Sequence, residues 1–215
     1  MDKNISRRDF FKVAGITMAA ASLTCSGLGY AASQSPKVVI PETRFGKENS
    51  MDKKILITFA TRAGSTADVA AAMGESLGAR GFCVDVKAVK EKPLLAGYQA
   101  AILGSAIRMG NWLPEAVDFI EANQQALNQM PVALFTVHML NSGEDETSRA
   151  NRLAYLDKIR PLLNQAEEVY FEGKMDFSRL SLVDRLISKM VKAVEADKRD
   201  WEKIRNWVPE MLAKV

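Results

Sequence analysis

Short apolar runs alternate with stretches of helical periodicity from Lys53 to the end of the chain, and this alternation constrains the fold more than any other feature. Runs with strand character occupy residues 54–60, 83–88, 101–105, 132–137 and 168–172. Strands that alternate with helices form parallel sheets covered by helices on both faces. The pattern therefore predicts one α/β domain over residues 53–215.

Four helices are expected between and after these strands, each with apolar residues at helical spacing. The first is expected to end at Gly81, in the position of a C-terminal cap, and the second to begin at Pro114, which suits a first helical turn. The third should stop before Pro161. Their inward faces are predicted at Val69, Met73 and Leu77; at Val117, Ile120 and Leu127; at Leu153, Leu156 and Ile159; and at Trp201, Ile204, Val208 and Leu212.

The loop after the first predicted strand has the composition of a phosphate-binding site. It reads Thr61-Arg62-Ala63-Gly64-Ser65-Thr66 and leads into a helix. Unpaired backbone N–H groups and the positive end of the helix dipole favour a bound anion there, and three hydroxyl groups add donors. The loop has neither a Walker ending nor the three-glycine dinucleotide pattern. The alternative is an ordinary turn in which Ser65 or Thr66 caps the helix.

The strand-T-x-x-G-x-T-helix pattern resembles the FMN phosphate loop of flavodoxins. The chain is most similar to the flavodoxin-type menaquinone-dependent protoporphyrinogen dehydrogenases of bacteria, over roughly residues 53 to 212. Besides the first loop, the resemblance is carried by Gly104-Ser105-Ala106-Ile107-Arg108-Met109-Gly110-Asn111, Val183-Asp184-Arg185 and Asp200-Trp201-Glu202. The chain departs from the family at Met109 and Asn111, where an aromatic residue and a histidine are typical.

This resemblance implies a flavodoxin-like, doubly wound, five-stranded sheet of order 2-1-3-4-5, with an extra helical insert before the last helix. Ligands then bind where strands 1 and 3 end. FMN is the implied cofactor and carries the redox chemistry. The implied FMN-binding residues are Thr61, Arg62, Ala63, Gly64, Ser65 and Thr66; Ser105, Ala106, Ile107, Arg108, Met109, Gly110 and Asn111; and Val137, His138, Met139 and Leu140. No side chain is assigned as a catalytic acid or base.

Several single residues have two readings. Met109 and Trp112 could flank the flavin ring. The alternative for Trp112 is that it packs beneath the following helix. His138, the single histidine, either faces a ligand or is structural. Cys83 is expected in the core. One histidine and few cysteines cannot assemble the usual nitrogen and sulfur ligand sets, so no metal site is expected.

The insert at residues 175–198 combines apolar residues at helical spacing with basic ones. A basic amphipathic helix can lie on a membrane surface, and it can also cover the sheet or pack on the core. The resemblance links this insert to activity and to membrane quinone. The apolar positions are Leu180, Val183, Leu186, Ile187, Met190, Val191 and Val194.

The N-terminus reads as a twin-arginine export signal over residues 1–32. Ser6-Arg7-Arg8-Asp9-Phe10-Phe11-Lys12 precedes a weakly apolar stretch, and small residues follow at residues 29–32. The protein is therefore expected in the periplasm or on the outer face of the cytoplasmic membrane, with the signal either cleaved or retained as an anchor. Residues 33–52, with scattered proline and charge, are expected to form a linker.

The formal net charge of +3 falls near neutrality once the signal is set aside, which argues against nucleic acid as a partner. The expected function is an oxidoreductase that passes electrons from a porphyrinogen-like donor through FMN to a quinone. Export cuts against haem synthesis, because that pathway is cytoplasmic in most bacteria. Two alternatives stay open: an exported electron-transfer protein that meets a redox protein, and a flavin-free binding module.

Overall fold

The computed structural model describes residues 43–46, 54–190 and 194–212. The predicted export signal at residues 1–32 and most of the predicted linker lie outside the described residues, as do Val191 of the insert and Lys53 at the start of the domain.

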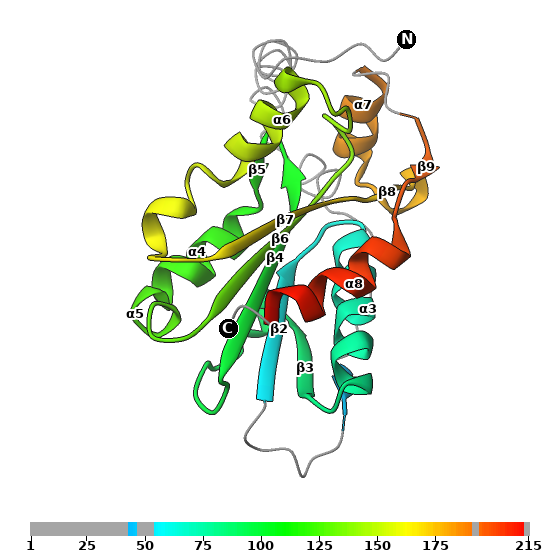
Figure 1. Ribbon diagram of the computed structural model, residues 1–215. Helices are drawn as coiled ribbons and strands as arrows, with labels where there is room; N and C mark the ends of the chain where they lie inside the picture. The colour runs from blue at the N-terminus through cyan, green and yellow to red at the C-terminus, as the bar shows by residue number, and fades with distance from the viewer. Residues whose placement is uncertain (1–42, 47–53, 191–193, 213–215) are drawn as a thin grey trace.

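Five parallel strands form the centre of the sheet, in the order β3-β2-β4-β6-β7 (Figure 1). These strands are β2 (Lys54–Ala60), β3 (Cys83–Ala88), β4 (Ala100–Arg108), β6 (Val132–His138) and β7 (Glu167–Glu172). Renumbered along the chain, this order is 2-1-3-4-5, so the predicted topology is confirmed. β2 and β6 are buried along almost their whole length because helices cover both faces of the sheet.

A sixth strand extends the edge of the sheet. β1 (Thr43–Phe45) pairs antiparallel with β3, so the predicted linker is wrong at these residues. The Nε atom of Arg44 donates to Asp85 Oδ1 at 2.6 Å, and Tyr98 and Lys54 also contact this carboxylate. Burial opposes ionisation of Asp85, but these three partners outweigh it and lower its pKa to about 2. A buried carboxylate that needs a cation therefore holds β1 in place.

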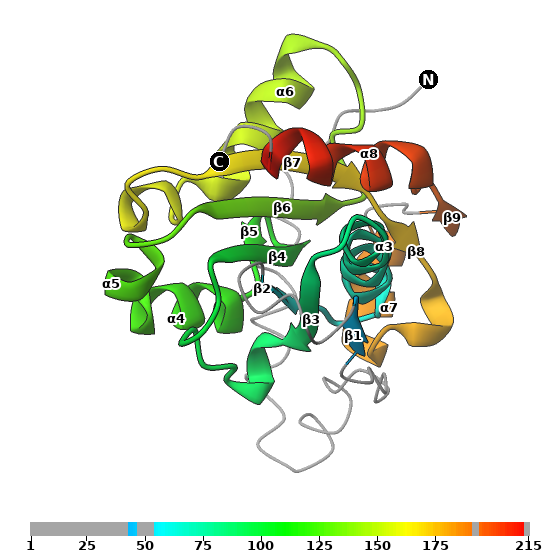
Figure 2. The same ribbon diagram turned by 60° about the horizontal axis from the view of Figure 1, so that its bottom comes forward.

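Helices cover the two faces of the sheet (Figure 2). α3 (Ser65–Ala79) and α8 (Trp201–Leu212) lie on one face, where Met73, Leu77 and Ile204 join a buried cluster with alternate residues of β2. α4 (Pro114–Ala122) and α5 (Gln124–Leu127) lie on the other, where Ile120 and Leu127 are buried. The expected start of the second helix and the expected inward faces of the first two helices are confirmed, except that Val117 is half-buried.

The prediction of a helix that stops before Pro161 is wrong in detail. α6 (Glu146–Leu153) begins at the cap Asp145 and leaves Leu153 53% exposed. Leu156 and Ile159 are buried, but they lie on or beside two short 3₁₀ helices, Ala154–Leu156 and Arg160–Leu162. The chain tightens into 3₁₀ turns here, with Ile159 N–H bonded to the Leu156 carbonyl, and this turns those two side chains inward.

The predicted insert forms a separate unit at the carboxyl ends of the strands (Figure 1). Two short strands, β8 (Lys174–Met175) and β9 (Ala196–Asp197), pair antiparallel at its base. Between them lie a 3₁₀ helix (Phe177–Arg179) and α7 (Leu182–Met190). The Ser181 hydroxyl accepts the Asp184 N–H at 3.0 Å and so caps α7.

Two smaller predictions concern individual residues. Cys83 is a free, buried cysteine, as expected. Gly81 adopts φ 91° just past α3, and the Phe82 N–H reaches back to the Leu77 carbonyl, which is the predicted glycine cap. The side chains of Val208 and Leu212 lie outside the described part of the chain, so that half of the predicted α8 face stays a prediction.

Candidate functional site

A cavity at the carboxyl ends of β2, β4 and β6 brings the three predicted loops together. The centre of a water molecule can occupy about 220 Å³ of it. The predicted residues that line it are Thr61, Arg62, Ala63, Ser65, Thr66, Ala106, Ile107, Arg108, Met109, Gly110, Val137, His138, Met139 and Leu140. The cavity lies at the point where the strand order reverses, which is where doubly wound sheets bind ligands.

The first loop includes a buried hydroxyl donor without a partner in the protein and leads into a helix whose start no side chain caps. Gly64 adopts φ 89°, its N–H bonds Thr61 Oγ1 at 3.0 Å, and no side chain caps α3. The alternative of a capped turn is therefore wrong. Thr66 is fully buried, and its Oγ1 has no hydrogen-bond partner in the structure. A buried hydroxyl without a partner is costly, so this loop has the donor chemistry of an anion-binding site.

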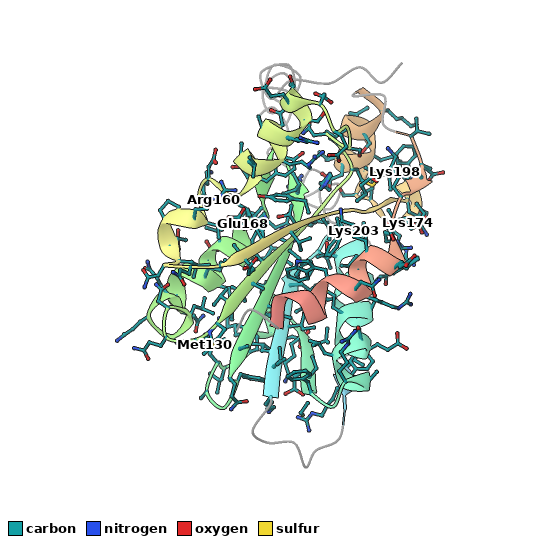
Figure 3. The ribbon with its side chains drawn as sticks, in the orientation of Figure 1. Met130, Arg160, Glu168, Lys174, Lys198 and Lys203 are labelled. Atoms are coloured by element: carbon teal, nitrogen blue, oxygen red, sulfur yellow. The ribbon has the colours of Figure 1, made fainter. Side chains whose placement is uncertain are left out.

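Two further residues of this loop are engaged with other elements. Arg62 forms a bidentate salt bridge with Glu115 in the first turn of α4. The Ser65 hydroxyl accepts the Lys174 N–H at 2.9 Å, which leaves its own proton available to donate. Gly173 allows this approach, because a Cβ there would lie 2.8 Å from Val137 and 3.2 Å from Ser65 Oγ. Figure 3 shows Lys174 at one end of β7 and the Arg160–Glu168 ion pair at the other.

The second loop is a tight hairpin. β4 continues to Arg108 and turns at Met109 and Gly110 into β5 (Asn111–Trp112). Both turn residues have positive φ, 52° and 74°, a backbone conformation that costs energy for methionine but not for glycine. The Asn111 amide donates to the Met109 carbonyl at 2.9 Å. The hairpin therefore projects Met109 into the cavity and holds Asn111 behind it.

Two residues beside the second loop, Ser105 and Trp112, support the site from behind. The Ser105 hydroxyl donates to the Ala106 carbonyl and accepts the Leu113 N–H, which fixes the base of the hairpin. Trp112 is 3% exposed and its indole N–H donates to Thr136 Oγ1 at 2.9 Å. Of its two readings, the structure therefore supports core packing. Three of the predicted FMN-binding residues do not line the cavity: Ser105, Asn111 and Gly64.

The third loop is held by α6 and by the 3₁₀ helix that follows it. Asn141 has φ 60°, and its amide donates to the Tyr155 hydroxyl at 2.7 Å. Arg152 donates to the carbonyl groups of Asn141 and Gly143, both at 2.6 Å. These bonds connect the third loop to α6 and to the 3₁₀ helix that follows it.

His138 ends β6 and is only 4% exposed. Burial lowers its pKa to about 4, because the charged ring would lose its hydration. The imidazole is therefore neutral at physiological pH. Its Nδ1 lies 2.9 Å from the Leu140 carbonyl oxygen, and its ring centroid lies 6.0 Å from that of Tyr155.

The structure adds lining residues that the sequence alone did not supply. Four of the nine come from the insert, which closes one side of the cavity, and Arg108 of the second loop bonds the insert through Asp184 at 2.8 Å. Asp184 could have been found, since it stands in one of the motifs that carry the family resemblance. The added residues are Leu113, Asn141, Tyr155, Gly173, Lys174, Met175, Leu180, Asp184 and Ser188. Within the described ranges, no cluster of His, Cys, Asp or Glu could hold a metal ion.

This sheet order, with three loops around a cavity at its switch point, defines the flavodoxin class. The family described as "Flavodoxin domain" matches residues 56–202, and the chain belongs to this family. It is similar to the protoporphyrinogen IX dehydrogenase [quinone] of Escherichia coli K12, with 26% identity over 74% of this chain and 94% of that protein. The protein of that name from Leishmania major is 23% identical over 76% and 77%.

A likeness to solved structures accompanies these matches. Oxidised Flavodoxin 1 from Bacillus cereus aligns with a TM-score of 0.48 and 15% identity over 76% of this chain and 99% of that one. The family and the fold together make this chain a flavodoxin-like flavoprotein related to an oxidoreductase, with FMN as the cofactor. The residues present fit FMN, because the uncapped start of α3 and the unpartnered Thr66 hydroxyl offer donors to a phosphate.

Proposed function

We propose that this protein is an FMN-dependent oxidoreductase that takes electrons from a porphyrinogen-like donor and passes them to a quinone. One observation carries the proposal: the first loop, which is predicted to bind a phosphate, and the two other predicted loops line the same cavity. The similarity to the protoporphyrinogen IX dehydrogenases of Escherichia coli and Leishmania major supports the choice of donor and acceptor.

The three loops divide the work of holding the cofactor. Residues 61–66 would hold the phosphate through backbone N–H groups and hydroxyls. Residues 106–110 and 137–140 would flank the ring, and the apolar side chains among them, such as Ile107 and Val137, would keep water away from it. FMN, when bound, supplies the electron-accepting chemistry. The protein supplies position and a largely apolar surrounding.

The charge around the cavity separates this proposal from its rival, an electron carrier that docks another redox protein. An acidic rim would mark such a carrier. Among the described residues that line the cavity, Arg62, Arg108 and Lys174 are basic and Asp184 is acidic. Each basic group has a carboxylate partner, because Arg62 pairs with Glu115, Arg108 with Asp184 and Lys174 with Asp176. This lining has no surplus of carboxylates to attract a cationic protein surface, so it gives no support to the carrier.

An anaerobic half-reaction tests the proposal. The FMN-loaded protein is mixed with protoporphyrinogen IX, and the visible flavin absorption is followed. The proposal predicts bleaching by the porphyrinogen and recovery of the absorption on addition of menaquinone. Bleaching that fails with porphyrinogen, together with reoxidation only by a partner protein, would establish the carrier instead.

The insert supports a proposal about where the quinone is met. Leu182, Leu186 and Val194 are 66%, 56% and 74% exposed, and none of them belongs to either buried cluster. Exposed basic side chains, Lys189 among them, accompany these residues. We propose that the insert rests on an anionic membrane surface beside the cavity. In the part of the chain that the structure describes, no helix is long and apolar enough to cross a bilayer.

Vesicle sedimentation tests the membrane contact. Wild-type protein is expected to sediment with vesicles that contain anionic lipid, and the double variant L182S/L186S to stay in the supernatant. The variant L153S, which changes an exposed leucine of α6 outside the insert, is the matched control and should sediment as wild type does. Equal sedimentation of all three proteins would contradict the proposal.

The location of the protein is a proposal from the sequence alone. The paired Arg7 and Arg8 predict export of the folded, FMN-loaded protein by the twin-arginine route. Cell fractionation should find wild type outside the cytoplasm and the R7K/R8K variant inside it. A wild-type protein that remains in the cytoplasm would remove this proposal and leave the redox function untouched.

A further inference from the structure

The single histidine of the chain faces the cavity as a hydrogen-bond acceptor. His138 lines the cavity at the end of β6, and its Nδ1 lies 2.9 Å from the Leu140 carbonyl oxygen. A carbonyl oxygen can only accept, so Nδ1 carries the proton. In the neutral ring Nε2 then carries a lone pair and no proton. The backbone of the third loop thus fixes the tautomer.

The neighbouring groups leave Nε2 without a protein donor. Among the described residues, no hydrogen bond to His138 Nε2 is formed. The Tyr155 hydroxyl, on the nearest ring, receives the Asn141 amide and points to the Leu140 carbonyl at 3.4 Å. Arg152 donates to the carbonyl groups of residues 141 and 143. A nearly buried acceptor on a cavity wall with no partner of its own is suited to a donor on the ligand.

We propose that His138 Nε2 accepts a hydrogen bond from the N3–H of the FMN ring, so that this side chain sets the orientation of the ring in the cavity. The inference rests on the proposed FMN site and adds a residue that binds the cofactor through its side chain. The oxidised flavin ring has one N–H group, at N3, between two carbonyl groups. A neutral acceptor matches that group, whereas a protonated histidine would repel it.

Two substitutions separate the two nitrogen atoms of the ring. In H138N the amide nitrogen stands near the position of Nδ1 and keeps the donor to the Leu140 carbonyl, but the acceptor toward the cavity is lost. In H138Q the amide oxygen reaches the position of Nε2 and restores the acceptor. FMN should therefore bind about fivefold to tenfold more weakly to H138N than to wild type, and within about twofold to H138Q.

A methylated cofactor completes the test. 3-Methyl-FMN lacks the N3–H donor, so wild type should lose about the same factor with this analogue as H138N loses with FMN. H138N should show no further loss with the analogue, because the shared hydrogen bond is already absent. If the affinity of H138N for 3-methyl-FMN falls by the product of the two separate factors, His138 acts only through the structure of its loop. That result would overturn the proposal.

Nuclear magnetic resonance gives a test that needs no variant. Full-length protein without a histidine tag, labelled with ¹⁵N, is loaded with ¹⁵N-labelled FMN. Because the chain has one histidine, its two ring nitrogen signals are unambiguous. A scalar coupling between FMN N3 and His138 Nε2 across the hydrogen bond is expected. Bound FMN without this coupling refutes the role of His138 alone, whereas a protein that takes up no FMN refutes the proposed function.

Discussion

The unpartnered hydroxyl of Thr66 leads to a prediction in which two effects have opposite signs. In the protein without FMN, Thr66 is fully buried and its Oγ1 has no hydrogen-bond partner, which costs about 1 to 3 kcal/mol of stability. The T66V variant keeps the shape of the side chain and removes that hydroxyl. Its free energy of unfolding should therefore rise by about 1 kcal/mol.

The FMN-bound protein should respond in the other direction. A hydrogen bond to a charged phosphate contributes about 1.5 to 3 kcal/mol, so T66V should bind FMN about 10-fold to 150-fold more weakly than wild type. Urea unfolding of the apoprotein gives the stability, and quenching of FMN fluorescence gives the affinity.

The chain supplies a matched control for this experiment. Thr58 is also fully buried, its Oγ1 also lacks a partner, and it does not line the cavity. T58V should stabilise the apoprotein as T66V does and leave the FMN affinity unchanged. If T66V binds FMN as tightly as wild type while T58V behaves as expected, the Thr66 hydroxyl does not contact the phosphate and the reasoning is wrong.

Three further predictions concern the sheet, a buried ring and the insert. G104A should lower the free energy of unfolding by about 3 kcal/mol or more, measured with urea, because its Cβ would lie 1.9 Å from the ring of Phe135. His138 has a pKa of about 4 in the folded protein, below its ordinary value, so the unfolded chain binds a proton first and stability falls as the pH drops below about 6.5. Between about pH 7 and pH 5 the loss should be about 2 kcal/mol in wild type and nearly absent in H138N. R108A should change global stability by less than about 1 kcal/mol, because the pair with Asp184 is partly exposed, yet speed hydrogen exchange in the insert. Unchanged exchange there would show that Arg108 does not hold the insert.

Much of the fold could be predicted because the central strands have a local signature. β2 and β3 match the predicted residues, since a strand buried on both faces is a short apolar run between turn residues. β1 could not be predicted. Its pairing with β3 depends on Arg44 meeting Asp85, a contact between residues 41 positions apart.

The errors of the site prediction also have a physical cause. The motifs carried most of the lining residues, but they could not separate those that face the cavity from those that support it. Asn111 and Ser105 are adjacent to lining residues but do not line the cavity, because their side chains hydrogen-bond to the backbone of the hairpin and its base. Tyr155, on the 3₁₀ helix after α6, and Lys174, on β8, were missed because they lie outside the motifs and reach the cavity only in the folded chain.

The central claim is that the loop at residues 61–66 binds the phosphate of FMN, and calorimetric titration with FMN and with riboflavin tests it most directly. Riboflavin carries the same ring and ribityl chain without the phosphate. The structure predicts one FMN bound per chain and an affinity for riboflavin at least about 100-fold lower, since several donors of this loop would have no acceptor. Equal affinity for the two ligands would contradict the account.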